Sequence, residues 1–125
     1  MTEEDGKRFG ALAERLAARR LRGLGYRILA SNVRLRGGEL DLVAKQGEIL
    51  VFCEIKARRA TGSGEPGEAV DARKRNKLAR LAMEYLGSRP DLAHLECRFD
   101  VVLLWRSGLW WRVEVIADAF RPGWE

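Results

Sequence analysis

The segment GGELDLVAKQGEILVFCEIKAR, residues 37–58, constrains the fold of this chain more than any other. Two runs of mostly apolar, strand-favouring residues meet there across a short polar turn, which predicts a β-hairpin within a sheet. The hairpin nevertheless carries four charged side chains, Glu39, Asp41, Glu54 and Lys56. Charges in a half-buried sheet cost free energy unless they are compensated, so these residues point to a specific structural or chemical role.

The alternation of side chains along a strand indicates how these charges are arranged. If the chain folds back about residues 46–47, counting outward pairs Asp41 with Phe52 and Glu39 with Glu54. Paired residues project from the same face of a sheet, so all four charged side chains share one face. In this register Asp41 is a diagonal neighbour of Glu54, at roughly 7–8 Å.

The shared face carries a net negative cluster, because three of its four charges are carboxylates. A hard divalent cation, Mg²⁺ or Mn²⁺, compensates such a cluster economically, since both prefer oxygen ligands. We therefore expect Asp41, Glu54 and Glu39 to be metal ligands. Lys56 would orient or activate a water molecule, or stabilise charge on a phosphate oxygen, so the set predicts metal-dependent phosphodiester cleavage.

A plain surface hairpin with a polar outer face is the alternative explanation. It predicts polar residues throughout that face, whereas Val43, Leu50 and Phe52 lie on the same face as the acids. The face is therefore at least partly covered, and acids on a covered face are more typical of functional sites.

Glu14 extends the candidate site to the N-terminal helix. Its neighbours three and four positions away in both directions are glycine or alanine, so this side of the helix can approach another element closely. A carboxylate among small residues can point into a site, and we expect Glu14 to support catalysis. Three arginines nearby in sequence leave an ordinary surface glutamate as the alternative.

The remaining sequence predicts an α/β domain in which helices flank a mixed sheet, in the order α-β-β-β-α-β-β. Apolar spacing and turn signals give helices over residues 7–22 and 68–86 and strands over 26–35, 37–58, 95–105 and 109–116, the last two joined about residues 107–108. Residues 58–68 are expected to form a mobile loop, and Asp118 to Phe120 a short terminal turn. Residues 1–125 are expected to form one domain, because the chain is too short for two cores.

Composition is typical of soluble globular proteins, with 46% hydrophobic and 33% charged residues. No apolar run approaches the length of a membrane span, and the N-terminus lacks the apolar stretch of a signal peptide, so we expect a cytoplasmic protein. Lys and Arg outnumber Asp and Glu by 23 to 18, which is consistent with a polyanionic partner. The single histidine argues against a zinc site, and Cys53 and Cys97 are expected to be buried free thiols.

Several motifs together resemble the YraN-like family of predicted nucleases, in the restriction-endonuclease-like, or PD-(D/E)xK, superfamily. They are GGELDLVA, LVFCEIKAR, EAV followed by KRNKL, RFDVV and the terminal ADAF, and the similarity runs along nearly the whole chain. The resemblance implies a mixed sheet flanked by helices. It also implies a metal-dependent nuclease that acts on nucleic acid, with Mg²⁺ or Mn²⁺ as its cofactor.

The resemblance assigns roles position by position. Asp41 matches the first metal-binding acid, Glu54 the second and Lys56 the catalytic lysine. Glu14 matches the acid that some superfamily members supply from the first helix, and Glu39 belongs to the family's own GE-D string. One departure is that a leucine, rather than a proline, precedes Asp41.

Basic residues on the loop and the second helix predict a nucleic-acid interface. Lys74 and Lys77 match basic positions of the family and lie three apart, on one face of a helix. The whole predicted interface is Arg58, Arg59, Arg73, Lys74, Lys77 and Arg80. A solvated helix face is the alternative, but five cations within eight residues beside a basic loop favour phosphate contacts.

The sequence therefore predicts a metal-dependent DNA endonuclease or structure-selective nuclease. A chain this small has no separate module for reading sequence, so it would recognise the shape of DNA, and a homodimer would give two cuts across a duplex. A nucleic-acid-binding accessory protein of DNA processing or repair, without cleavage, is the first alternative. A protein-interaction module with a basic surface is the second, and salt-dependent DNA binding separates it from the other two.

Overall fold

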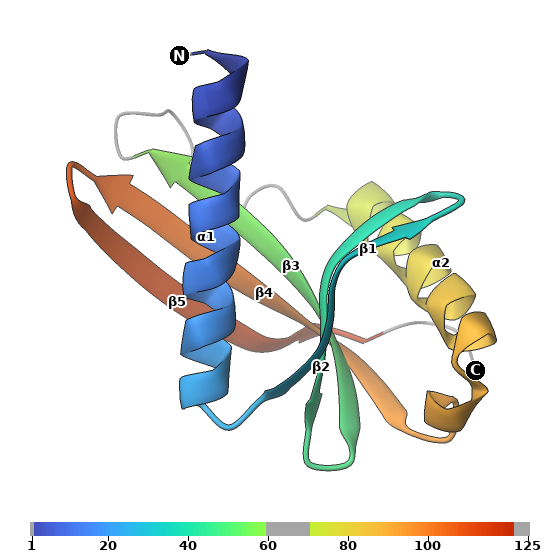
Figure 1. Cartoon of the computed structure of the whole chain (residues 1–125). Helices are drawn as coiled ribbons and strands as arrows, with labels where there is room; N and C mark the ends of the chain where they lie inside the picture. Colours follow the sequence, from blue (N-terminus) through green and yellow to red (C-terminus); the bar gives the residue numbers. More distant parts are fainter. Residues whose placement is uncertain (1, 60–70, 122–125) are drawn as a thin grey trace.

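The computed structural model describes residues 2–59 and 71–121, which form a five-stranded mixed sheet with helices on both faces (Figure 1). The strands lie side by side in chain order. They are β1 (Arg27–Leu35), β2 (Gly38–Gln46), β3 (Ile49–Arg59), β4 (Glu96–Ser107) and β5 (Trp110–Phe120). β3 and β4 are parallel and the other neighbours are antiparallel, so the predicted α/β class and order of elements are confirmed.

The first helix, α1 (Glu3–Gly23), begins at a capping box. Thr2 Oγ1 accepts a hydrogen bond from the Asp5 N–H, and the Asp5 carboxylate accepts one from the Thr2 N–H. This exchange satisfies two N–H groups that have no partner within the helix itself. Its small buried residues, Ala13 and Ala17, then let the helix lie close to the sheet.

The second helix, α2 (Ala72–Ser88), is capped at its N-terminus by Asp71, whose carboxylate accepts a hydrogen bond from the Lys74 N–H at 2.9 Å. A turn of 3-10 helix, η2 (Pro90–Leu92), follows and leads into β4. Together they form part of the crossover that a parallel pair such as β3 and β4 requires. No helix in the described part of the chain is long and apolar enough to cross a membrane.

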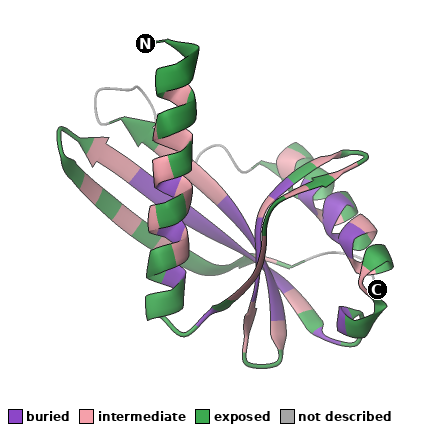
Figure 2. Cartoon of the chain, in the orientation of Figure 1, coloured by how far each residue is buried: buried purple, intermediate pink, exposed green. Residues whose placement is uncertain are grey.

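Two apolar cores, one on each face of the sheet, hold these layers together, and their buried residues run along the middle of the strands (Figure 2). The core under α2 comprises Leu40, Val43, Leu50, Phe52, Leu78, Leu81, Ala82, Tyr85, Leu92, Leu95 and Phe99. The core under α1 comprises Ala13, Ala17, Leu21, Tyr26, Leu42, Ala44, Val51, Cys53, Val102 and Leu104. Successive residues of β3 therefore pack into opposite cores, because side chains alternate between the two faces of a strand.

Several of the predicted boundaries were wrong. The first helix begins at Glu3 instead of Lys7, and the second begins at Ala72 instead of Glu68. The expected loop at residues 58–68 begins too early, because Arg58 and Arg59 are the last residues of β3, and residues 60–68 lie outside the described residues. The expected terminal turn is instead the end of β5, which continues to Phe120. Asp118 interrupts the regular register there with a φ of 55°, and its N–H bonds to the buried Asp100. Cys53 and Cys97 are free thiols as expected, although Cys97 is only half-buried.

The predicted register of the β2–β3 hairpin was also wrong. Its turn consists of Gly47 and Glu48, with Gly47 at a φ of 60°, and Phe52 pairs with Val43 instead of Asp41. The prediction had placed the glycine second in the turn. The first position of this turn has a positive φ, which glycine adopts more easily than other residues do. The β4–β5 turn shows the same one-residue difference, with Gly108 at a φ of 61°.

Candidate functional site

The candidate site lies where β2 separates from β3. The pairs between these strands run from Gln46 and Ile49 to Leu42 and Cys53, and β2 then continues with β1 alone as the two curve away together (Figure 1). Asp41 is the next residue along β2. Its carboxylate Oδ2 accepts a hydrogen bond from the main-chain N–H of Ile55 at 2.8 Å, so a side chain replaces the missing ladder partner of β3.

Glu54 projects from β3 into the same site and is only 7% exposed. Two ammonium groups share its Oε1 atom, Lys74 Nζ at 3.2 Å and Lys56 Nζ at 3.7 Å. Lys56 comes from the same strand, whereas Lys74 comes from the first turn of α2. A buried carboxylate needs such partners, because an uncompensated charge in a protein interior is strongly unfavourable.

Asp41 is the acid whose ionisation the site changes most clearly. The pKa of its carboxyl is raised from 3.8 to about 6, first by burial and then by the nearby charges of Glu54 and Glu14. The Ile55 N–H and the Lys74 ammonium group act in the opposite direction and lower the pKa. The structure thus brings the predicted residues Asp41, Glu54 and Glu14 into electrostatic contact, as the sequence suggested.

Glu14 reaches this site from α1 and is held by a residue that sequence reasoning missed. Its Oε2 accepts a hydrogen bond from Asn32 Nδ2 at 3.1 Å. Asn32 lies in β1 with a φ of 51°, in the left-handed region that asparagine tolerates better than most residues. The polar pair of Ser31 and Asn32 inside an otherwise apolar run was the signal that could have identified it.

Glu39, the third predicted metal ligand, lies elsewhere. It is exposed on β2 and its Oε2 is 3.8 Å from Nε of Arg34 on the neighbouring strand. No hydrogen bond or ion pair joins it to Asp41 or Glu54 in the described structure. Its role as a ligand is untested, and its exposed position beside Arg34 favours Asp41 and Glu54 as the direct ligands.

The predicted interface residues do not all face solvent. Lys74 is half-buried against Glu54, so it belongs to the candidate site as much as to a binding surface. Arg58 donates to the Ala57 carbonyl, and the Arg59 guanidinium stacks over the Phe9 ring at 4.4 Å. The other three, Arg73, Lys77 and Arg80, are exposed on α2.

A buried polar network on β4 was also missed by sequence reasoning. Asp100 is fully buried and accepts hydrogen bonds from Arg98 Nε at 2.9 Å and the Tyr26 hydroxyl at 2.5 Å. Arg98 also donates to Gln46, and burial raises the pKa of Tyr26 to about 12. The spacing Arg-x-Asp within an apolar strand was the available signal. The network joins β2 and β4 to Tyr26, which lies between α1 and β1.

The donor set at the site suits a hard divalent cation. Asp41 and Glu54 supply the carboxylate oxygens that such ions prefer, and burial together with the neighbouring acids raises the pKa of Asp41, so a cation would stabilise its ionised form. Within residues 2–59 and 71–121, no group of three or more His, Cys, Asp or Glu side chains is arranged to hold a metal ion. Mg²⁺ is commonly held by one or two carboxylates, with waters and substrate phosphates as its other ligands. Asp41 and Glu54 are the residues that would hold it.

Comparison with known proteins matches the chain to one family along most of its length. A model of the family described as "Uncharacterised protein family UPF0102" matches residues 13–104, which include every residue of the candidate site. A UPF0102 protein of Magnetococcus marinus is 46% identical over 118 residues, which cover 94% of this chain and 95% of the relative. A UPF0102 protein of Moorella thermoacetica is 50% identical over 116 residues, with 91% and 96% covered.

Proposed function

The chain belongs to the UPF0102 family, and from that premise we propose that it is a divalent-metal-dependent nuclease of the restriction-endonuclease-like superfamily, acting on DNA. The observation that carries the proposal is the meeting of Asp41, Glu54 and Lys56 at the point where β2 leaves β3. Two acids and a lysine on adjacent strands are the residue types that metal-assisted phosphodiester hydrolysis requires.

The two acids have distinct tasks in this proposal. Asp41 is oriented by the Ile55 N–H, which leaves Oδ1 to bind an ion, and Glu54 supplies the second carboxylate. A bound Mg²⁺ or Mn²⁺ would polarise a phosphate oxygen and increase the acidity of a water molecule. Burial and the neighbouring acids make the ionised form of Asp41 unfavourable, and a bound cation would offset both effects.

The lysines supply positive charge beside the reacting phosphate. Lys56, 3.7 Å from Glu54 Oε1, is placed to orient the attacking water or to stabilise charge on a phosphate oxygen. Lys74 holds the same carboxylate oxygen from α2, so we assign it a positioning role at Glu54. Glu14, fixed by Asn32, adds negative charge beside Asp41 and would bind a metal-bound water more readily than the ion itself.

DNA binding in this proposal uses the exposed cations of α2 and the end of β3. Arg73, Lys77 and Arg80 are exposed on the helix that also presents Lys74 to the site. Phosphate contacts of this kind bind DNA without regard to base sequence and weaken as salt increases. Such contacts would recognise the shape of the substrate, such as a junction, a flap or a single strand.

A cleavage assay tests the proposal. Single-stranded, duplex, flap and four-way DNA substrates are incubated with Mg²⁺ or Mn²⁺, with a chelator in the control reactions. Metal-dependent cleavage of at least one substrate is expected, and Asp41→Asn should abolish it. Salt-dependent binding of these substrates without cleavage would instead indicate the accessory role, and the absence of binding would contradict a nucleic-acid partner altogether.

A further inference from the structure

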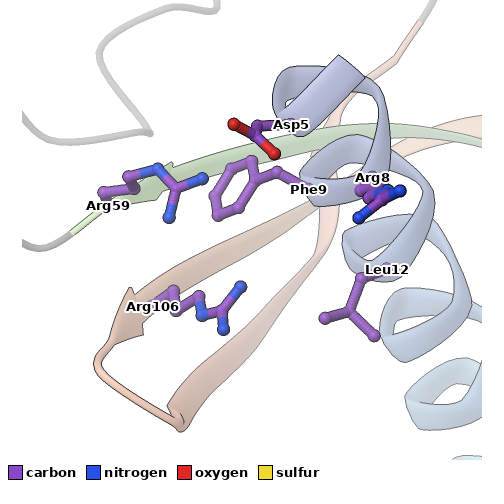
Figure 3. Close-up of a pocket in the computed structure, with 6 residues that line it drawn as sticks. All are labelled: Asp5, Arg8, Phe9, Leu12, Arg59 and Arg106. Carbon is purple, nitrogen blue, oxygen red and sulfur yellow. The ribbon is translucent and has the colours of Figure 1, made fainter. Parts of the chain in front are cut away.

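A second site of interest is the cavity between the first turns of α1 and the ends of β3 and β4. Its volume is about 380 Å³. Six residues line it: Asp5, Arg8, Phe9, Leu12, Arg59 and Arg106. Figure 3 shows Arg59 and Arg106 reaching from the strands toward the helix, with the Phe9 ring beside the Arg59 guanidinium. The volume lies within the range of small-ligand sites.

Stacking holds the two strand arginines of this cavity in place. The Arg59 guanidinium lies over the Phe9 ring at 4.4 Å, and Phe9 stacks in turn on Trp111, with ring centroids 5.3 Å apart. The Arg106 guanidinium lies over the Trp111 ring at 5.6 Å, and its Nε donates to the Gly108 carbonyl. A guanidinium that is already held by stacking loses little further side-chain entropy when it binds a ligand.

The charges around the cavity favour an anion. Three of its lining residues are arginines, and Asp5 is the one acid among the described residues that line it. The Asp5 carboxylate already caps α1 by accepting the Thr2 N–H. Arg8 forms an exposed ion pair with Glu4, which contributes little because water screens it. The faces of Phe9 are covered by Arg59 and Trp111, so a planar base has no free ring on which to stack.

We propose that this arginine cavity binds a phosphate group of a nucleic-acid strand. Arginine forks match the geometry of phosphate oxygens and bind them through paired charge-assisted hydrogen bonds. Phe9 and Leu12 are the apolar residues of the lining described, whereas three arginines supply charged and directional hydrogen-bond donors. The phosphate is therefore the part of the ligand that the cavity recognises.

The choice of a nucleic-acid strand over another phosphate compound rests on the proposed function. β3 carries both Glu54 and Arg59, five residues apart. At about 3.3 Å per residue these positions are roughly 17 Å apart, which is the rise of about five nucleotides of one strand in B-form DNA. Arg59 projects from the opposite face of the sheet to Glu54, so the strand would pass around the end of β3 to reach the cavity.

Binding of a short probe without metal tests the cavity separately from catalysis. The probe is a fluorescent tetrathymidylate, measured by anisotropy in the presence of a chelator, and compared with the same tetramer carrying a neutral methylphosphonate backbone. The parent should bind the anionic tetramer and lose most of its affinity for the neutral one. Inorganic phosphate should compete only at much higher concentration, because a strand presents several phosphates to the surrounding cations.

Four substitutions locate the binding. Arg106→Gln should weaken tetramer binding about tenfold, the usual effect of losing a charge-assisted hydrogen bond. Arg112→Gln is the matched control, because Arg112 is in the same hairpin, is stacked on Trp105 at 5.2 Å, and projects from the other face. Asp5→Asn should tighten binding, since it removes a carboxylate from the cavity. Arg8→Gln should also weaken binding. Because Arg8 makes only an exposed ion pair in the described structure, this variant tests the cavity even if Arg106→Gln alters the structure of the hairpin.

The outcomes separate this inference from the proposed nuclease. Equal losses for Arg106→Gln and Arg112→Gln would overturn the cavity as the binding site, as would equal affinity for the charged and neutral tetramers. Inorganic phosphate that competes as well as the tetramer would overturn the assignment to a strand. The measurement excludes metal and cleavage, so its result is independent of nuclease activity. A protein that fails to cut DNA can still bind the tetramer as described, and a protein that cuts DNA can fail to bind the tetramer.

Discussion

Lys74 Nζ lies 3.2 Å from Glu54 Oε1, closer than Lys56 Nζ at 3.7 Å. The lysine nearest to the buried acid thus comes from α2 rather than from the strand that carries the Glu-x-Lys motif. This contact couples the position of α2 to the charge balance of the site. It also means that the basic residues of α2 do not form one uniform binding surface.

The contact predicts different defects for two lysines of the same helix. Lys74→Gln should reduce kcat for DNA cleavage by tenfold or more, because Glu54 loses its closer partner and Asp41 loses a charge that lowers its pKa. Lys77→Gln, the control three residues away and exposed, should raise KM and reduce the salt dependence of binding by a log–log slope of about one. Identical kinetic defects in the two variants would contradict the positioning role of Lys74.

Asp41 makes the stability of the protein depend on pH in an unusual direction. Its folded-state pKa, about 6, is higher than the ordinary value of 3.8, so the folded protein binds this proton more tightly than the unfolded chain does. The free energy of unfolding therefore falls as pH rises from about 4 to about 6, and the penalty remains above that range. Asp41→Asn should remove this loss.

Urea unfolding of the parent and Asp41→Asn at several pH values measures this effect. The stability of the variant relative to the parent should increase from pH 4.5 to pH 7.5, since all other titrating groups are common to both proteins. A difference that stays constant over this range would show that Asp41 is not destabilised by its surroundings.

Metal binding should be visible as a change in melting temperature. A cation that binds only the folded state at about 100 times its Kd stabilises by roughly 2.7 kcal/mol, enough to raise Tm by about 10 °C in a domain of this size. Mn²⁺ should raise the Tm of the parent and have little effect on Glu54→Gln. Glu39→Gln makes the same chemical change at an exposed residue paired with Arg34 and should respond like the parent. A response lost in Glu39→Gln would restore Glu39 as a direct ligand.

The buried network on β4 should support the fold independently of the site. Asp100→Asn leaves the Arg98 guanidinium buried without its charged partner, and such losses cost about 3–5 kcal/mol. Urea unfolding should show a loss of this size, with metal binding per folded molecule unchanged. A loss below about 1 kcal/mol would mean that the network is no stronger than an exposed ion pair.

The fold and the grouping of Asp41, Glu54 and Lys56 were predictable because strand periodicity depends on local sequence. Asp41, Glu54 and Lys56 meet as expected even though the register was wrong by one residue in each strand. Moving the turn from residues 46–47 to Gly47 and Glu48 leaves the alternation of faces unchanged, so the error did not separate the acids. Placing Gly47 at the first position of a two-residue turn, where a II′ turn has its glycine, would have given the correct register.

Contacts between distant elements were not predictable by the same means. Lys74 and Asn32 reach the site because α2 and β1 approach the end of the β2–β3 ladder, and no local pattern specifies that approach. The arginine cavity likewise combines Arg8, Arg59 and Arg106 from three elements. Sequence spacing identifies which residues share a face of one element, whereas packing decides which faces meet.

Cleavage by Glu54→Gln compared with Glu39→Gln is the most direct measurement of the central claim. The two variants lose the same charge from the same hairpin, one at the buried site and one at its exposed edge. With Mn²⁺ and the substrate that the parent cuts best, Glu39→Gln should retain most of the parental rate, and Glu54→Gln should lose at least a hundredfold, the scale expected when an electrostatic catalytic group is removed. Parental rates in Glu54→Gln, or no metal-dependent cleavage by the parent on any of the four DNA structures, would contradict the proposed nuclease.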